Sequence, residues 1–257
     1  MPKYNAYLID LDGTIYHGKE PIPAAKRFIE RLQNAKIPYL FVTNNSTKTA
    51  KDVADNLTVN HNIKTTVDQV YTSAMATADY VKGLAGSGQK VYLIGEAGLK
   101  DALENAGIDL VPATEANVVV MGLDRNFTYQ KLKEATFAIA RGAKFIATNA
   151  DTNLPSEEGM LPGAGSLVAA LTTATGVEPT IIAKPEAPIM EGALAKLNHP
   201  DHPVMVGDNY NTDILAGIKN GLDTLLVYTG VSKPADVAKE VNQPTDFVAN
   251  FDEWSVE

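Results

Sequence analysis

Short apolar runs alternate with longer stretches of mixed polarity along most of the chain. Runs rich in branched and aromatic residues predict buried strands at residues 4–11, 38–42, 70–72, 91–94, 118–121, 144–147, 180–183, 203–206, 224–227 and 246–249. The intervening stretches predict helices at residues 24–35, 47–57, 74–84, 97–106, 129–141, 165–175, 187–197 and 212–220. Strands that alternate with helices in this way predict an α/β fold, a Rossmann-like doubly wound parallel sheet with helices on both faces.

The alternation of strands and helices is interrupted at two places. A Gly- and Ser-rich turn at residues 83–88 is followed by a fresh start of the pattern, and residues 151–165 are polar and rich in Pro and Gly. We therefore expect an inserted α/β cap domain at residues 78–180, with a catalytic core formed by residues 1–77 and 181–257. A chain of 257 residues has room for two such domains.

Polar side chains follow several predicted strands, all in the outer segments of the chain. They are Asp10 and Asp12, Thr43 to Asn45, Lys184, and Asp208. Ligands of doubly wound sheets bind at the carboxyl ends of the strands, so these side chains are expected to line one site. The insertion contributes none of them, which is the arrangement expected of an enzyme with a core and a cap.

The first of these motifs is Asp10-Leu11-Asp12-Gly13-Thr14, directly after the first strand. Strand side chains alternate between faces, so Asp10 and Asp12 are predicted to point to the same side. Gly13 allows the backbone to leave the sheet at angles that other residues resist. Two like charges this close repel each other unless a cation or a shared proton relieves them, which is a reason to look for a metal.

Composition excludes several classes of function. The formal charge of −9 argues against nucleic-acid or anionic-membrane binding as the main task, because both need a basic surface. The absence of cysteine excludes disulfides, thiol catalysis and thiolate metal sites. No apolar run approaches the roughly 20 residues that a membrane span needs, and no secretory signal pattern precedes the first strand. We expect a cytoplasmic protein.

Each motif taken alone also fits a structural role. Asp-x-Asp-Gly-Thr is compatible with a solvated turn, and Thr43 to Ser46 with a turn and a helix cap. Lys184 is compatible with a surface lysine. Gly207-Asp208-Asn209 is compatible with a frequent turn, and Asp213 with a first-turn residue stabilised by the helix dipole. Four such elements in this order, each at a strand end, are far harder to explain as turns.

The ordered set resembles the motifs of the haloacid dehalogenase superfamily over essentially the whole chain. The matching residues are Asp10 to Thr14 for the first motif, Thr43-Asn44 for the second, Lys184 for the third, and Gly207-Asp208 with Thr212-Asp213 for the fourth. The large insertion resembles the second (C2) type of cap. The run Thr148 to Asp151, followed by Pro162 to Ser166, is similar to subfamily IIA, the branch of NagD-like nucleotide phosphatases and 4-nitrophenylphosphatase-like enzymes.

This resemblance implies a Mg²⁺-dependent phosphatase that works through an aspartyl-phosphate. Asp10 would be the nucleophile, and Asp12 would protonate the leaving oxygen and then deprotonate the attacking water. Mg²⁺ would be held by Asp10, the backbone carbonyl of Asp12, and Asp208. Besides Asp12, the substrate phosphate would contact the Thr43 hydroxyl, the Asn44 backbone N–H and Lys184. Asp213 would orient Lys184 or a metal-bound water.

Asp12 also separates reaction classes, because a departing halide needs no acid and a departing alkoxide does. We therefore expect hydrolysis of small phosphorylated metabolites such as nucleoside monophosphates or sugar phosphates, with 4-nitrophenyl phosphate as an artificial substrate. A phosphomutase and a phosphoacceptor or ligand-binding module without turnover are the alternatives. The sequence names neither the physiological substrate nor the oligomeric state, and a homodimer stays open.

Overall fold

The computed structural model describes residues 3–85, 88–156 and 158–256 of the chain. Contacts between Cα atoms divide it into two compact units. The first unit comprises Met1–Thr43, Ala50–Tyr71 and Lys184–Glu257, and the second comprises Asn44–Thr49 and Thr72–Ala183. Within the described residues, no helix combines the length and the apolar character that a membrane crossing requires.

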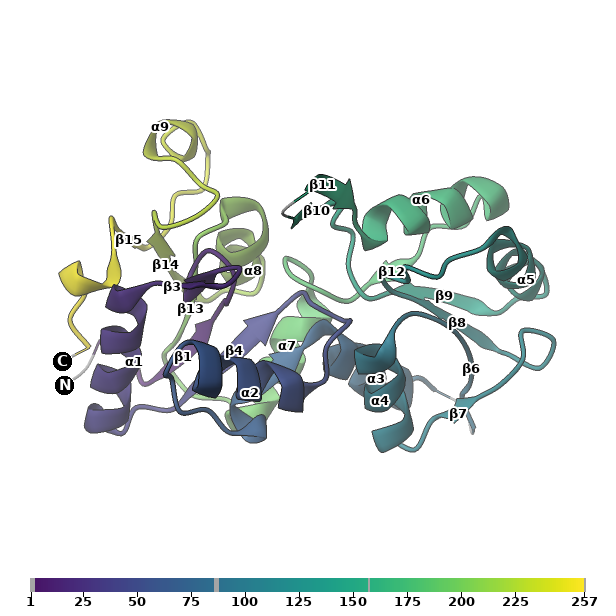
Figure 1. The fold of residues 1–257 in the computed structure, drawn as a ribbon, viewed down its shortest axis with the longest axis horizontal. Helices are drawn as coiled ribbons and strands as arrows, with labels where there is room; N and C mark the ends of the chain where they lie inside the picture. The colour runs from purple at the N-terminus through teal and green to yellow at the C-terminus, as the bar shows by residue number, and fades with distance from the viewer. Residues whose placement is uncertain (1–2, 86–87, 157, 257) are drawn as a thin grey trace. The chain divides into compact units, whose positions relative to one another are not determined.

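A six-stranded sheet forms the centre of the first unit (Figure 1). Its order is β15 (Asp246–Val248), β14 (Asp223–Val227), β13 (Pro203–Gly207), β1 (Ala6–Ile9), β4 (Tyr39–Thr43) and β5 (Val70–Thr72). The strand β1 pairs in parallel with both β13 and β4, and Ile9 lies opposite Val206 and Phe41. The residues that follow β1, β13 and β4 therefore leave the sheet at the same edge.

Helices cover both faces of this sheet. The helices of the unit are α1 (Pro23–Ala35), α2 (Ala50–Asn60), α7 (Ala187–Lys196), α8 (Leu215–Lys219) and α9 (Pro234–Val237). In α1 the apolar residues Ala25, Phe28, Ile29 and Leu32 recur at helical spacing and are buried. Together with residues of α2 they pack against Tyr7, Ile9 and Phe41 in one core cluster. Leu226 packs with Ile214 in a separate cluster on the side of α8.

The second unit contains a five-stranded parallel sheet. Its order is β12 (Thr180–Ile181), β9 (Lys144–Ala147), β8 (Val118–Met121), β6 (Lys90–Ile94) and β7 (Asp109–Leu110). Its helices are α3 (Ser73–Gly83), α4 (Ala97–Asn105), α5 (Tyr129–Ala140) and α6 (Ala164–Thr175). Residues of α5 and α6 form one core cluster with β8 and β9.

The parallel sheets confirm the predicted α/β, Rossmann-like fold class. The small antiparallel hairpins β2 (Tyr16–His17)–β3 (Glu20–Pro21) and β10 (Asn153–Ser156)–β11 (Gly159–Pro162) were not predicted. Their residues lack the branched apolar runs that mark buried strands. The helix predicted at residues 212–220 begins instead as a π-helical segment, Tyr210–Ile214, that continues into α8.

The two units do not follow the predicted domain limits residue by residue. The segment Asn44–Thr49 and the start of α3 group with the second unit, whereas the sequence places the start of the insertion at residue 78. A short loop belongs to the unit against which it packs. A hydrophobic pattern does not reveal which unit that is. The division into a catalytic core and a cap stays a prediction.

Candidate active site

Asp10 and Asp208 lie side by side at the carboxyl ends of β1 and β13. The backbone N–H of Asp10 donates to the carbonyl of Val206 at 2.9 Å, which continues the parallel pairing one residue past β1. The Thr14 hydroxyl lies 2.9 Å from Asp208 Oδ1 and 3.3 Å from Asp10 Oδ2. The pairing of the two strands thus brings residues 198 positions apart in the chain into one acidic cluster.

Lys184 is the cation of this cluster. Its side chain is buried, and Nζ lies 2.6 Å from Asp10 Oδ1, 2.7 Å from Asp213 Oδ1 and 2.9 Å from the Val42 carbonyl oxygen. Burial by itself lowers the pKa of a lysine, but the charges of Asp10 and Asp213 outweigh it and hold the pKa of Lys184 above its ordinary value. The lysine therefore stays protonated and links the two carboxylates.

Asp213 reaches the cluster from the π-helical segment that follows β13. Its Oδ2 accepts from the backbone N–H of Asn209 at 3.1 Å, while Oδ1 accepts from Lys184. A side chain at Gly207 would overlap with the Asp213 carboxyl group. The glycine at the end of β13 thus leaves the space that Asp213 needs to approach Lys184.

The acidic cluster has the composition of a site for a hard divalent cation. Oxygen atoms of Asp10, Asp208 and Asp213 all lie within 4.8 Å of one another. Burial, reinforced by the charge of Asp10, raises the pKa of Asp208 to about 6, and burial also raises the pKa of Asp213. Carboxylates so crowded are stabilised by a cation, and Mg²⁺ prefers such oxygen ligands. These residues fit the predicted metal.

Backbone groups and glycines shape the space around Asp208. Its Oδ2 accepts from the backbone N–H of Val231 at 2.7 Å. A Cβ atom at Gly13 would approach Asp208 Oδ2 to 2.5 Å, and one at Gly230 would overlap with the same oxygen. Gly13 also has φ +91°, a conformation that other residues rarely adopt. Gly230 and Val231 were not singled out from the sequence, although they follow β14 closely enough for the strand-end rule to find them.

Asp12 occupies a different position from the clustered carboxylates. Its side chain is exposed, and Oδ1 accepts from the backbone N–H of Gly18 at 3.1 Å. The turn is closed by a hydrogen bond from the Gly13 N–H to the Tyr16 carbonyl at 2.7 Å. Asp12 is therefore close in sequence to Asp10 of the acidic cluster, but its own side chain is exposed to solvent.

Thr43 and Asn44 follow β4, the strand on the other side of β1. Thr43 is the last residue of β4 and is buried at the same sheet edge as Asp10. Asn44 begins the segment that packs within the second unit, and its carbonyl accepts from Ser73 Oγ at 2.6 Å and from Asn149 Nδ2 at 3.1 Å. The peptide bond between them is thus the first of the points where the chain passes from one unit to the other.

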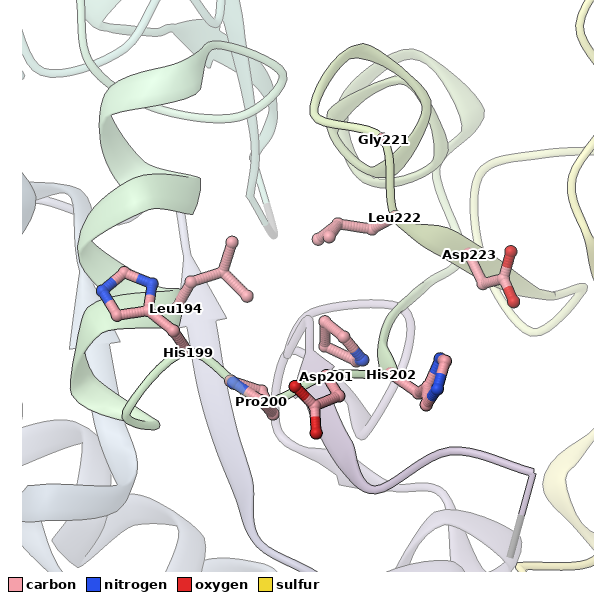
Figure 2. A pocket seen from close by; sticks show the side chains of 9 residues that line it. Leu194, His199, Pro200, Asp201, His202, Gly221, Leu222 and Asp223 are labelled. Atoms are coloured by element: carbon pink, nitrogen blue, oxygen red, sulfur yellow. The ribbon is translucent and has the colours of Figure 1, made fainter.

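A surface pocket lies at the opposite ends of β13 and β14, lined by residues that include Pro203 and Asp223, the first residues of these strands (Figure 2). Figure 2 shows the rings of His199 and His202 on opposite sides of the view. Among the residues that the structure describes, these histidines do not belong to any compact group of metal-ligating side chains. We assign no chemistry to this pocket.

Comparison with known families identifies the class of protein that this fold and site define. Residues 7–109 match the haloacid dehalogenase-like hydrolase family model, and residues 181–254 match a HAD-hydrolase-like model. The chain belongs to the haloacid dehalogenase-like hydrolases, as its motifs predicted.

Individual relatives narrow the class to phosphatases. The chain is 47% identical to the 5'-nucleotidase YutF of Bacillus subtilis over 99% of this chain and 98% of that protein. It is also 47% identical to an acid sugar phosphatase of Staphylococcus epidermidis, over 95% of this chain and 94% of that protein. A crystal structure of a single mutant of the thermostable NPPase from Geobacillus stearothermophilus is similar over 100% of both chains, with 48% identity and a TM-score of 0.92. These relatives confirm the predicted enzyme class, a HAD phosphatase of the NagD-like type.

Proposed function

We propose that this phosphatase is Mg²⁺-dependent and hydrolyses small phosphomonoesters with Asp10 as the nucleophile. The observation that carries the proposal is the ion pair between Asp10 and Lys184 at 2.6 Å, with a carboxylate oxygen of Asp208 within 4.8 Å of one of Asp10. A carboxylate oxygen fixed in place by an ion pair with a lysine is positioned for attack on phosphorus. The named relatives act as hydrolases, which favours transfer to water over the phosphomutase alternative.

The reaction proceeds in two displacements. In the first, a carboxylate oxygen of Asp10 attacks the phosphorus, the ester P–O bond breaks, and the Asp12 side chain gives its proton to the leaving oxygen. In the second, Asp12 takes a proton from water as the water oxygen attacks the same phosphorus, and the bond between phosphorus and Asp10 breaks. Inorganic phosphate leaves, and both carboxyl groups return to their starting states.

The remaining site residues neutralise and position the transferring phosphoryl group. Lys184 contributes a fixed positive charge, the Thr43 hydroxyl and the Asn44 backbone N–H donate to phosphoryl oxygens, and Asp213 positions Lys184. Asp10, the Asp12 carbonyl and Asp208 hold Mg²⁺. When bound, the cation supplies further neutralisation of the phosphoryl charge.

The substrate class rests on the relatives and on the second unit. The relatives are named for nucleotides, sugar phosphates and nitrophenyl phosphate, which share a small phosphomonoester. We propose that the second unit is a cap that contacts the group esterified to phosphate, as lids generally do. The physiological substrate is then one small phosphorylated metabolite of this class.

Phosphate release measured over a panel of esters tests this function. We expect the wild-type protein to release phosphate from 4-nitrophenyl phosphate, nucleoside monophosphates or sugar phosphates in the presence of Mg²⁺ and to stop when EDTA is added. Asp10→Asn keeps the size of the side chain and is expected to abolish turnover without changing the circular dichroism spectrum. Substantial residual turnover in a folded Asp10→Asn protein would refute the assigned nucleophile.

A further inference from the structure

The carboxyl edge of the second sheet holds a segment of the protein's own chain. Segment Asn44–Thr49 belongs to the second unit and packs against residues that follow three of its strands. The Gly98 N–H, beyond β6, donates to the Thr47 carbonyl at 3.0 Å. After β9, the Thr148 hydroxyl donates to Ser46 Oγ at 3.2 Å. Doubly wound sheets commonly bind their ligands at this edge, but here the edge holds the segment that continues from Thr43.

The space at this edge is fitted closely to segment Asn44–Thr49. A Cβ atom at Gly98 would overlap with the Lys48 backbone, and one at Gly122, the residue after β8, would lie 3.0 Å from both Ser46 Oγ and Thr148 Oγ1. Ser46 and Thr148 are both buried. Segment Asn44–Thr49 is therefore held in one arrangement by small residues and buried hydroxyl groups.

Two buried side chains donate hydrogen bonds to a single atom, the carbonyl oxygen of Asn44. Ser73 Oγ donates to it at 2.6 Å and Asn149 Nδ2 at 3.1 Å. Ser73 is fully buried and Asn149 is 6% exposed, so both donors act away from bulk water, where hydrogen bonds are strong and costly to lose. The other end of the Asn149 amide, Oδ1, accepts from the Asp151 N–H at 3.1 Å, which holds the orientation of the side chain.

We infer that Asn149 and Ser73 are positioning residues for phosphate binding. This inference rests on the proposed function, in which the Thr43 hydroxyl and the Asn44 N–H bind the phosphoryl group. Two donors on the Asn44 carbonyl restrict rotation about the backbone of Asn44 and hold its Cα in place. The Asn44 N–H is thereby held in the orientation in which it donates a hydrogen bond to a phosphoryl oxygen. The second unit thus contributes to phosphate affinity through the backbone of Asn44.

Asn149→Asp tests this role because it changes only one of the two contacts. The carboxylate retains an oxygen for the Asp151 N–H, but it replaces the donor to the Asn44 carbonyl with a repelling oxygen. We expect the dissociation constant of inorganic phosphate, measured by calorimetry in Mg²⁺ with the full chain, to rise by about tenfold, and by about threefold in Ser73→Ala, given the usual worth of one hydrogen bond. The Mg²⁺ activation constant is expected to stay unchanged.

Two matched variants separate positioning from general stability. Asn117 has the same pattern at the opposite edge of the sheet, since Oδ1 accepts from the Lys90 N–H at 2.9 Å and Nδ2 donates to the Gly88 carbonyl at 3.5 Å. Ser166 Oγ donates to the Thr152 carbonyl at 2.7 Å. Asn117→Asp and Ser166→Ala are expected to leave phosphate affinity within twofold of the wild type, whatever they do to the unfolding temperature.

The outcomes distinguish this inference from the proposed function. Unchanged phosphate affinity in folded Ser73→Ala and Asn149→Asp would overturn the positioning role, as would an equal loss in Asn117→Asp. If Asn149→Asp does not fold, Ser73→Ala decides alone, because alanine fits a buried helix start. A wild-type protein that binds phosphate but releases none from esters would refute the hydrolase while the variant comparison still decides the positioning role.

Discussion

Lys184 has a structural role as well as the proposed chemical one. Its ammonium group is buried between Asp10 and Asp213, so each charge is compensated by an opposite charge at hydrogen-bond distance. A buried ion pair adds little net stability, but removing one partner leaves an unpaired buried charge, which is strongly unfavourable. The residue that we propose to neutralise the phosphoryl group therefore also stabilises the fold of the site.

We predict that Lys184→Met lowers the free energy of unfolding by about 3–5 kcal/mol at pH 7.5. The loss is expected to be smaller at pH 5.5, because the raised pKa values of Asp208 and Asp213 allow protons to replace the missing charge. Urea denaturation at both pH values measures the difference. Lys219→Met removes an exposed partner of Glu186 and is expected to cost less than about 1 kcal/mol. Equal losses in the two variants would contradict the prediction.

His61 is a second buried ionisable residue of the first unit. It is 3% exposed, and its ring stacks on Tyr16 with centroids 4.5 Å apart. Neither ring nitrogen has a hydrogen-bond partner among the described residues. Burial lowers the pKa of His61, so the folded protein holds this imidazole neutral at pH values where the unfolded chain binds a proton.

This shift predicts an acid-dependent loss of stability. The unfolded state binds the proton more readily than the folded state. His61 therefore does not lower the free energy of unfolding above about pH 6.5, but the free energy of unfolding decreases as the pH falls below that value. His61→Phe keeps a ring against Tyr16 and cannot titrate, so its unfolding temperature is expected to fall less between pH 7 and pH 5 than that of the wild type. His17→Gln, at an exposed position, serves as the control. If the unfolding temperatures of the wild type and of His61→Phe fall by the same amount between pH 7 and pH 5, the prediction is wrong.

At the scale of elements, glycines that follow or end strands leave the space that neighbouring carboxylates occupy. The loop after β14 passes so close to Asp208 that only glycine fits at position 230, and the next N–H donates to the same carboxylate. A hydrophobic pattern predicts where such a strand ends, but it does not reveal which neighbouring strand the following loop meets.

We predict that Gly230→Ala displaces the Asp208 carboxylate and raises the Mg²⁺ concentration needed for half-maximal phosphatase activity by about tenfold or more, since ligand position controls metal affinity. Gly83→Ala, at the end of α3 where an added Cβ meets nothing within 4 Å, is the matched control. Titration of activity with Mg²⁺ measures both variants. The same Mg²⁺ requirement in both would show that Asp208 does not bind the metal.

Element prediction succeeded where burial dominates and failed where it does not. The strands β1, β4, β8, β13 and β14 are buried along most or all of their length, so their apolar runs were visible in the sequence. The hairpin strands β2, β3, β10 and β11 pair locally through the backbone, and the residues of β2, β3 and β11 are mostly exposed. Their formation depends on backbone pairing that no apolar pattern records.

At the scale of the whole molecule, the acidic cluster would link folding to the metal binding that we propose. The pKa of Asp208 is about 6 in the folded protein without metal, against about 3.9 for an ordinary aspartate. The folded state thus binds the proton more tightly, so the stability of the metal-free protein falls as the pH rises from about 4 through 6. A bound cation replaces the proton and offsets this loss.

We therefore predict that Mg²⁺ raises the unfolding temperature, and that the increase is larger at pH 7.5 than at pH 5. Ligand that binds only the folded state stabilises by about 2.7 kcal/mol at a hundred times its dissociation constant. Differential scanning calorimetry with and without Mg²⁺ measures the increase, and Asp208→Asn is expected to remove most of it. A shift of the same size in Asp208→Asn would exclude this residue as a ligand.

The sequence by itself determined the fold class, the family and the residues to examine, because each motif is local. A buried strand, a glycine turn and the side chains between them occupy a few consecutive positions, and Asp10 to Thr14 could be interpreted without knowing any neighbour. Only the tertiary structure decided how these motifs meet. The contacts of Thr14 with Asp208, of Lys184 with Asp10, and of Asn149 with Asn44 join residues 194, 174 and 105 positions apart. Strand order and loop packing create such contacts, and neither leaves a periodic trace in the chain.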